Sequence, residues 1–153
     1  MRNFVVIAGL LAVPAETALE VPMDAQTQVS QDPRLLQLDK YFVQHDCPIR
    51  SMAADFLAAA DNNDLDWRLL PSISVIESGG GKDYRNNNIF GWDACRERFP
   101  SVRAGIHIVA GKLSKSKIYR DKDVNGILSI YNPRPEYPGR VKSVMRTISA
   151  SLN

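Results

Sequence analysis

Glu77 is the residue whose type and position best suit acid–base chemistry. It lies at the end of an apolar segment that contains Ile73 and Ile76, just before the glycine run of residues 79–81. We expect it in the last turn of a helix, where the partial negative charge of the helix terminus disfavours an anion. Apolar neighbours would act in the same direction and favour the protonated carboxyl. Such an acid can protonate a glycosidic oxygen, and the glycines would let a substrate chain approach the backbone. The alternative is a surface glutamate at a helix end.

The segment after the glycines combines amides with aromatic rings. It reads Asn86-Asn87-Asn88-Ile89-Phe90-Gly91-Trp92. Amide groups match sugar hydroxyl and acetamido groups, and an indole face suits the apolar face of a pyranose ring. The alternative is a turn whose aromatic residues belong to the core.

A third candidate element lies much further along the chain. Tyr131-Asn132-Pro133 is followed by Tyr137 and Arg140. Prolines break helices, so we place this motif at a helix end. Its simplest alternative interpretation is a helix stop with no chemical role.

These elements together resemble the lysozyme-like superfamily. The likeness rests on residues 65–81, which end in Val75-Ile76-Glu77-Ser78 and the glycines, on residues 87–92 and on residues 131–133. It points to bacterial glucosaminidase-type domains (endo-β-N-acetylglucosaminidase-like), which are related to soluble lytic transglycosylases. It covers roughly residues 51–148, about two-thirds of the chain.

The resemblance implies an enzyme that cleaves β-1,4 linkages between N-acetylated sugars in the glycan strands of peptidoglycan. It implies that Glu77 is the catalytic acid/base and that Tyr131 lies across the cleft from it. Sugar contacts are expected from the residues that surround these two. The expected substrate-binding residues are Ser78, Asn87, Asn88, Phe90, Trp92, Asn132 and Tyr137.

Two departures leave the reaction type open. Transglycosylase domains usually carry a Gly-Leu-Met-Gln-type segment, and this chain has Ile89-Phe90-Gly91-Trp92 instead. A two-carboxylate hydrolase needs a second acid about 5–5.5 Å or about 6.5–9.5 Å from the first. Asp83 and Asp93 are available, but the sequence places neither. We therefore favour hydrolysis and retain lytic transglycosylation, in which the sugar's own 6-hydroxyl attacks.

Other function classes fit the same residues. A catalytically silent glycan-binding module of the same fold would use Trp92 and the asparagine run. A structural helical domain that recognises a protein partner is a third reading. Neither requires Glu77 to react, so substitution of Glu77 by glutamine separates them from the enzyme.

The elements that must position these side chains are helices. Apolar spacing predicts one from Leu35 to Pro48, and caps at Ser51, Asp66 and Ser101 predict three more. A shorter helix spans residues 124–130, and Pro138 begins a last one. Its apolar face is Val141, Val144, Met145, Ile148 and Leu152. The predicted fold is mostly α (α+β at most): a lysozyme-like helical domain with a short loop or β-hairpin insertion, residues 82–99, beside the substrate cleft.

Composition indicates a single globular domain, and the first residues indicate export. With 153 residues, 44% hydrophobic and 24% charged side chains and a net charge of +2, the chain has the profile of one globular domain and not of a basic nucleic-acid binder.

Residues 1–15 have the features of a signal peptide, which are the positive charge of Arg2, an apolar run and small residues near Ala15. Ala18 is another cleavage point, and a buried N-terminal element is the alternative. Residues 16–33 read as a flexible leader and 34–153 as the domain. We expect a secreted or periplasmic protein without stable membrane insertion after signal removal. The oligomeric state stays open.

Export gives the cysteines a specific interpretation. Cys47 and Cys95 would meet an oxidising compartment, and we expect a disulfide between them. Two separate buried thiols are one alternative. A metal site with His45 and His107 is another, but it lacks the usual ligand spacing. We expect no cofactor and no metal.

Overall fold

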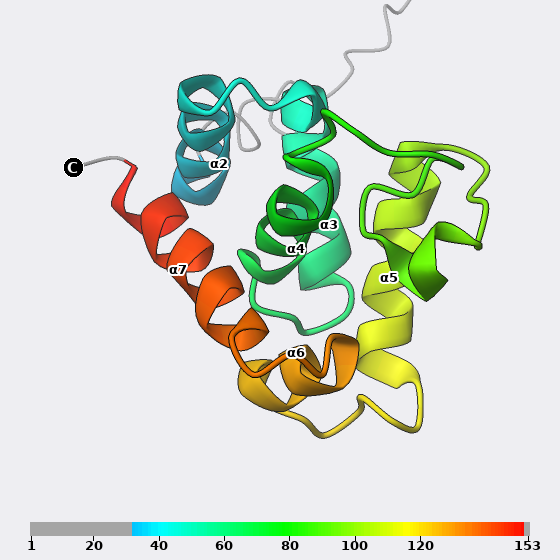
Figure 1. Ribbon diagram of the computed structural model, residues 1–153. Helices are drawn as coiled ribbons and strands as arrows, with labels where there is room; N and C mark the ends of the chain where they lie inside the picture. Colours follow the sequence, from blue (N-terminus) through cyan, green and yellow to red (C-terminus); the bar gives the residue numbers. More distant parts are fainter. Residues whose placement is uncertain (1–31, 152–153) are drawn as a thin grey trace, which may run out of the picture.

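The computed structural model describes residues 32–151 as a set of helices joined by turns (Figure 1). The first half contains α2 (Pro33–Gln44), the 3-10 helix η1 (Pro48–Met52), α3 (Ala53–Asp61) and α4 (Leu69–Ser78). The second half contains the short helix η2 (Trp92–Cys95), α5 (Val102–Lys115), α6 (Val124–Tyr131) and α7 (Tyr137–Ala150). The mostly α prediction is confirmed. Within residues 32–151 no strand forms, and the expected hairpin is reduced to one isolated bridge between Arg85 and Asn88.

The expected signal peptide lies outside the described residues, and so does nearly all of the expected leader. The leader prediction was wrong at its end, because Pro33 is already the first residue of α2. Asp32 caps that helix through a 2.9 Å hydrogen bond that its side chain accepts from the Arg34 amide. Proline is well suited to this position, since the amide it lacks would have no helical partner.

The second half of the domain follows its predicted boundaries closely. Ser101 caps α5 by accepting a 3.1 Å hydrogen bond from the Ala104 amide. Asp123 caps α6 through the Gly126 amide at 2.7 Å. In α7 the apolar face is buried at Val141, Met145 and Ile148. Capping and apolar spacing therefore account for these helices.

Two predicted caps in the first half were wrong. Ser51 is exposed inside η1, and α3 begins at Ala53 without a side-chain cap. Asp66 binds the Arg68 amide at 3.0 Å, but α4 begins only at Leu69. Pro71 is therefore the third residue of α4, where its missing N–H costs no helical hydrogen bond.

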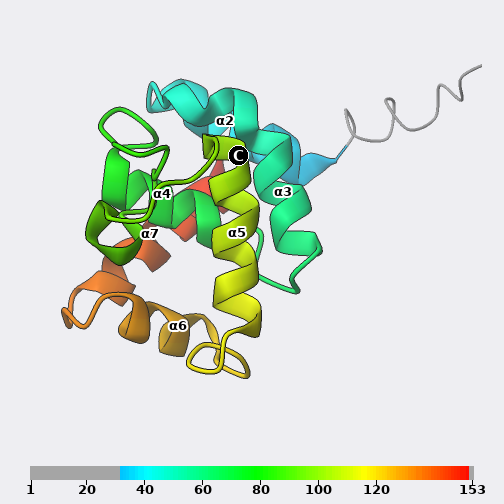
Figure 2. The same cartoon turned by 90° about the vertical axis from the view of Figure 1, so that its right-hand side faces the viewer.

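Helix α4 lies inside the helical cluster. It packs on α7 and on α3, while α2 packs on both α3 and α7, and α3 packs on α5. Both views place α6 across one end of the molecule, beside α5 and α7 (Figures 1 and 2). Leu69, Leu70 and Ile73 of α4 are fully buried as a result. The last turn of this central helix, which carries Glu77, lies at the surface. Among the described residues, no helix has both the length and the apolar character that a bilayer crossing requires.

Candidate active site

Helix α4 ends at three consecutive glycines whose backbones adopt the left-handed conformation. Gly79, Gly80 and Gly81 have φ values of +62°, +70° and +85°. A Cβ atom on Gly80 would lie 2.4 Å from Cys47 Sγ, and one on Gly81 would lie 2.6 Å from Ile49 Cγ2. Gly80 and Gly81 therefore pack the turn against the start of η1, at Cys47 and Ile49. The expected approach of a substrate chain to the glycine backbone is blocked at Gly80 and Gly81, where the protein itself occupies the space.

The Glu77 side chain lies between a tyrosine and a glycine. Its Oε1 accepts a 2.7 Å hydrogen bond from the hydroxyl of Tyr137. On its other side, a Cβ on Gly91 would lie only 2.8 Å from Oε2. Glu77 is exposed, so the apolar enclosure expected from Ile73 and Ile76 was wrong. An exposed carboxyl held on two sides is accessible to a substrate and restricted in orientation.

Two stacked tyrosines support this carboxyl. The rings of Tyr131 and Tyr137 lie 6.0 Å apart and within 10° of parallel. The Tyr131 hydroxyl donates a hydrogen bond to the carbonyl of Phe90. Burial raises the pKa of both phenols above the ordinary value, and the nearby Glu77 charge raises it further. Both hydroxyls therefore stay protonated at neutral pH and act as donors.

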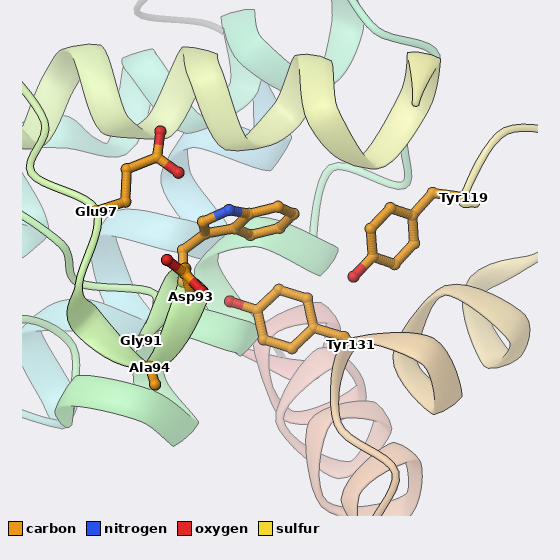
Figure 3. A pocket seen from close by; sticks show the side chains of 7 residues that line it. Gly91, Asp93, Ala94, Glu97, Tyr119 and Tyr131 are labelled. Atoms are coloured by element: carbon orange, nitrogen blue, oxygen red, sulfur yellow. The ribbon is translucent and has the colours of Figure 1, made fainter. Parts of the chain in front are cut away.

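An aromatic groove of about 410 Å³ lies next to Gly91 (Figure 3). Trp92 forms its centre, with the Tyr131 ring edge-on at 5.6 Å and the Tyr119 ring at 6.1 Å. The Lys112 ammonium lies 5.4 Å from the centre of the indole ring. Glu77 is not among the groove-lining residues, but Gly91 borders both the groove and the Glu77 carboxyl. The full lining is Gly91, Trp92, Asp93, Ala94, Glu97, Tyr119 and Tyr131.

The acidic side chains of the groove are paired within the chain. Asp93 pairs with Arg96, and Glu97 pairs with Lys112 at 2.8 Å. Of the two acids considered as a second carboxylate, Asp93 lines the groove, whereas exposed Asp83 belongs to the turn after α4. Asp93 and Ala94 both have φ of +50°, a region that side chains rarely adopt. The rim of the groove is therefore a strained turn.

Four of the expected substrate-binding residues are buried: Tyr137, which holds Glu77, and Phe90, Asn88 and Ser78, which belong to the structure of the site. Phe90 is fully buried and meets Phe56 edge-on. Asn88 is 1% exposed, and its amide binds the Trp92 and Glu97 carbonyls and the Trp92 amide. The buried Ser78 hydroxyl donates to the Ser74 carbonyl and accepts from the Gly81 amide. The prediction of direct sugar contact was wrong for these residues, because their polar groups and surfaces are already occupied.

Two further candidates stabilise turns. The Asn87 amide donates to the Phe99 carbonyl at 2.9 Å, and the Asn132 Oδ1 accepts from the Arg134 amide at 3.2 Å. Both residues are half-buried, and neither lines the groove. The structure thus gathers Glu77, Tyr137, Tyr131 and Trp92 into one site and leaves the asparagines to hold the surrounding turns.

Other groove residues were missed by sequence reasoning. Tyr119 comes from the turn between α5 and α6, and Glu97 and Lys112 form the ion pair beside Trp92. No local motif singles out Tyr119. It lies between Ile118 and Arg120 in the sequence, and its ring lies beside Trp92 of η2 only in the folded chain.

The predicted disulfide is wrong in this structure. Cys47 and Cys95 are both free thiols and lie apart. Cys47 is buried against Gly80, while Cys95 is a half-buried residue of η2 with a φ of +60°. Within residues 32–151, no three His, Cys, Asp or Glu side chains are placed to hold a metal ion. His45 instead stacks on Tyr41, with ring centres 4.2 Å apart.

Comparison with known proteins adds no assignment. No protein-family model, no curated protein and no solved structure matches this chain. The site combines an accessible carboxyl, a tyrosine donor and an aromatic groove.

Proposed function

We propose that this chain is an exported glycosidase that cleaves β-1,4 linkages between N-acetylated sugars in peptidoglycan. Glu77 is the general acid/base in this proposal, and Tyr137 and Tyr131 support it. The chain is a member of the lysozyme-like superfamily of the glucosaminidase type. The expected signal in residues 1–15 carries the proposed secreted or periplasmic location.

One observation carries the proposal: an exposed carboxyl is held between Tyr137 and Gly91, directly beside an aromatic groove. Aromatic faces suit the apolar faces of sugar rings. A positioned carboxyl within reach of a glycosidic oxygen supplies acid catalysis. The combination fits a bound glycan whose scissile bond lies near Gly91 and whose next sugar lies on Trp92.

The proposed reaction begins when protonated Glu77 donates its proton to the glycosidic oxygen as the bond from that oxygen to the anomeric carbon breaks. The Glu77 carboxylate then accepts a proton from the attacking group as a new bond to the anomeric carbon forms. Water as the attacking group gives hydrolysis, which we favour. The sugar's own 6-hydroxyl gives an anhydro product. The Tyr137 hydroxyl orients the Glu77 carboxyl throughout.

Glu77→Gln tests the proposal, because glutamine keeps the shape and removes the acid. We expect wild-type protein to clear purified cell wall in a zymogram and Glu77→Gln to leave it intact. Glu136→Gln is the control, since Glu136 is an exposed residue at the start of α7. Undiminished clearing by Glu77→Gln would overturn the catalytic assignment.

A catalytically silent glycan-binding module is the second candidate. The observation that favours it is that Glu77 does not line the groove itself. In that case wild-type protein would be retained on insoluble peptidoglycan and would release no soluble fragment. Loss of retention in Trp92→Ala, with no cleavage by wild type, would establish this reading in place of the enzyme.

A further inference from the structure

A second hollow lies between α6, α7 and the turn before α4. It has a volume of about 260 Å³ and shares no residue with the aromatic groove. Helices α4 and α6 both pack on α7, so α7 connects the two sides of the hollow (Figure 1). We call it the cationic hollow, because half of its lining residues are cations. The full lining is Asp66, Arg68, Val124, Lys142, Met145 and Arg146.

The charges in the cationic hollow do not balance. Its three cations, Arg68, Lys142 and Arg146, share the lining with a single carboxylate, that of Asp66. Three positive charges and one negative charge leave an excess of two, which equals the net charge of the whole chain, +2. In the part of the chain that the structure describes, no ion pair includes Lys142 or Arg146. The hollow is therefore a local concentration of positive charge.

Asp66 and the neighbouring Asp123 are both engaged within the chain. The Nε and Nη2 groups of Arg68 donate to the two carboxylate oxygens of Asp66, and Nη1 donates to Ser149 Oγ at 2.9 Å. A guanidinium has five N–H groups, so Arg68 is held in a fixed position and keeps two donors. Asp123 lies outside the lining, and its Oδ1 accepts from the Gly126 amide at 2.7 Å.

The two cations of α7 lie side by side. Lys142 and Arg146 are four residues apart, a spacing that puts them on one face of the helix, where like charges repel. The last turn of α7 contains no basic residue, so stabilisation of the helix terminus does not account for this pair. The Lys142 ammonium donates to the neutral Asn125 Oδ1 at 3.0 Å, which fixes its position without offsetting its charge. An anion between the two side chains would relieve the repulsion.

Apolar side chains complete the cationic hollow. Met145 is 5% exposed, Val124 is half-buried, and both belong to the lining. A water molecule takes about 30 Å³ of liquid, so a hollow of about 260 Å³ has room for more than a small ion. The apolar lining suits carbon atoms attached to an anionic group.

We propose that the cationic hollow binds a phosphomonoester, with Lys142 and Arg146 on the phosphate oxygens. Arg68 adds its two remaining N–H groups, and the ester carbon packs on Val124 and Met145. A phosphomonoester carries a charge of about −1.5 to −2 at pH 7 and three strong acceptor oxygens, which matches the excess of two positive charges. Guanidinium groups bind phosphate through paired hydrogen bonds, and a lysine adds a point charge. This site is separate from Glu77 and does not depend on the proposed glycosidase activity.

The test compares methyl phosphate, a phosphomonoester, with dimethyl phosphate, a monoanion of similar size. Each is titrated into the ¹⁵N-labelled full chain at low salt, and binding is followed by the NMR shifts of the Val124 and Met145 amides. We expect methyl phosphate to saturate these shifts and to bind about five-fold more tightly than dimethyl phosphate. In Lys142→Gln/Arg146→Gln, the affinity for methyl phosphate should fall about ten-fold.

Lys40→Gln/Arg98→Gln is the matched control, because it removes the same charge from two exposed residues outside the cationic hollow. It should keep the wild-type affinity, and circular dichroism should show both double variants folded. Shifts that do not saturate would overturn the proposal. Equal affinity of the wild type for the two esters would also overturn it, and so would unchanged affinity in Lys142→Gln/Arg146→Gln.

Sedimentation with phosphatidylcholine vesicles that contain phosphatidic acid distinguishes two sources of the phosphomonoester. Phosphatidic acid carries this group on a lipid. Protein that binds methyl phosphate and stays in the supernatant takes a soluble ester. Sedimentation of the wild type that Lys142→Gln/Arg146→Gln loses would assign the group to a lipid headgroup.

Discussion

The hydroxyl of Tyr137 donates a 2.7 Å hydrogen bond to Oε1 of Glu77, a residue 60 positions earlier in the chain. The two residues come from the start of α7 and the end of α4, which pack against each other. The Tyr131 ring stacks on Tyr137 and fixes its plane. The orientation of the exposed carboxyl thus depends on the packing of two core helices.

Tyr137→Phe removes this donor and keeps the ring. We expect cell-wall cleavage to fall at least ten-fold, because a hydrogen bond to a charged group contributes about 1.5–3 kcal/mol. The melting temperature should fall by only a few degrees, since the stacked ring remains. Rates of fragment release and thermal melts monitored by circular dichroism check both expectations. Tyr41→Phe is the control, because Tyr41 is also buried but lies on α2. Equal activity of Tyr137→Phe and wild type would show that the hydrogen bond has no role.

The raised pKa of the buried tyrosines predicts loss of stability at alkaline pH. Burial raises the pKa of Tyr131 and Tyr137 in the folded chain above the ordinary value of 10.0. The contribution of these two phenols to the free energy of unfolding is complete below about pH 10. It is lost as the pH rises further, because only the unfolded chain then releases the phenol protons. We expect tyrosinate absorbance from these residues to appear together with loss of helical circular dichroism. Titration of every tyrosine near pH 10 with unchanged helicity would contradict this.

Gly91→Ala should damage the site more than the fold. A Cβ there would lie 2.8 Å from Glu77 Oε2, and the φ of +64° disfavours alanine by about 1 kcal/mol. The carboxyl must move to make room, so we expect at least ten-fold slower cleavage with a modest loss of stability. Gly139→Ala in α7 is the control, because nothing lies within 4 Å of its added Cβ. It should keep activity and gain about 0.5–1 kcal/mol of stability. Unchanged activity in Gly91→Ala would remove Gly91 from the site.

Free cysteines predict a simple labelling result. Denatured, unreduced protein should give two thiols per chain, from Cys47 and Cys95. In the folded protein Cys95 should react first, because burial shields Cys47 and raises its pKa, which lowers its thiolate fraction. Mass spectrometry after alkylation counts the labels. A denatured chain without reactive thiols would contradict this and show that Cys47 and Cys95 form a disulfide.

Local sequence signals predicted the second half of the fold well. Ser101 and the apolar spacing of α7 act within a single helix, so their information is local. The start of α3 was missed because η1 precedes it and takes up Ser51. The position of Glu77 at the end of α4 was predicted, but its exposure depends on α7 and on Gly91, which lie far away in the sequence.

The substrate-contact predictions failed where burial decided the outcome. Phe90 and Asn88 have side chains that suit a sugar, but the folded loop uses one as core and the other as a hydrogen-bonded brace. Tyr119 reaches the groove from a turn whose sequence contains no recognisable motif. The disulfide prediction came from the expected compartment and not from geometry, so it carried no information on whether the two sulfurs meet.

Mass spectrometry of the products formed from purified peptidoglycan is the direct test of whether Glu77 cleaves the glycan. With wild-type protein, we expect soluble fragments cut between N-acetylated sugars. New reducing ends would mark hydrolysis, and anhydro ends would mark attack by the sugar's 6-hydroxyl. With Glu77→Gln, these fragments should disappear while the protein stays folded. The same fragments at the same rate from Glu77→Gln, or none from wild type, would contradict the claim that Glu77 cleaves the glycan.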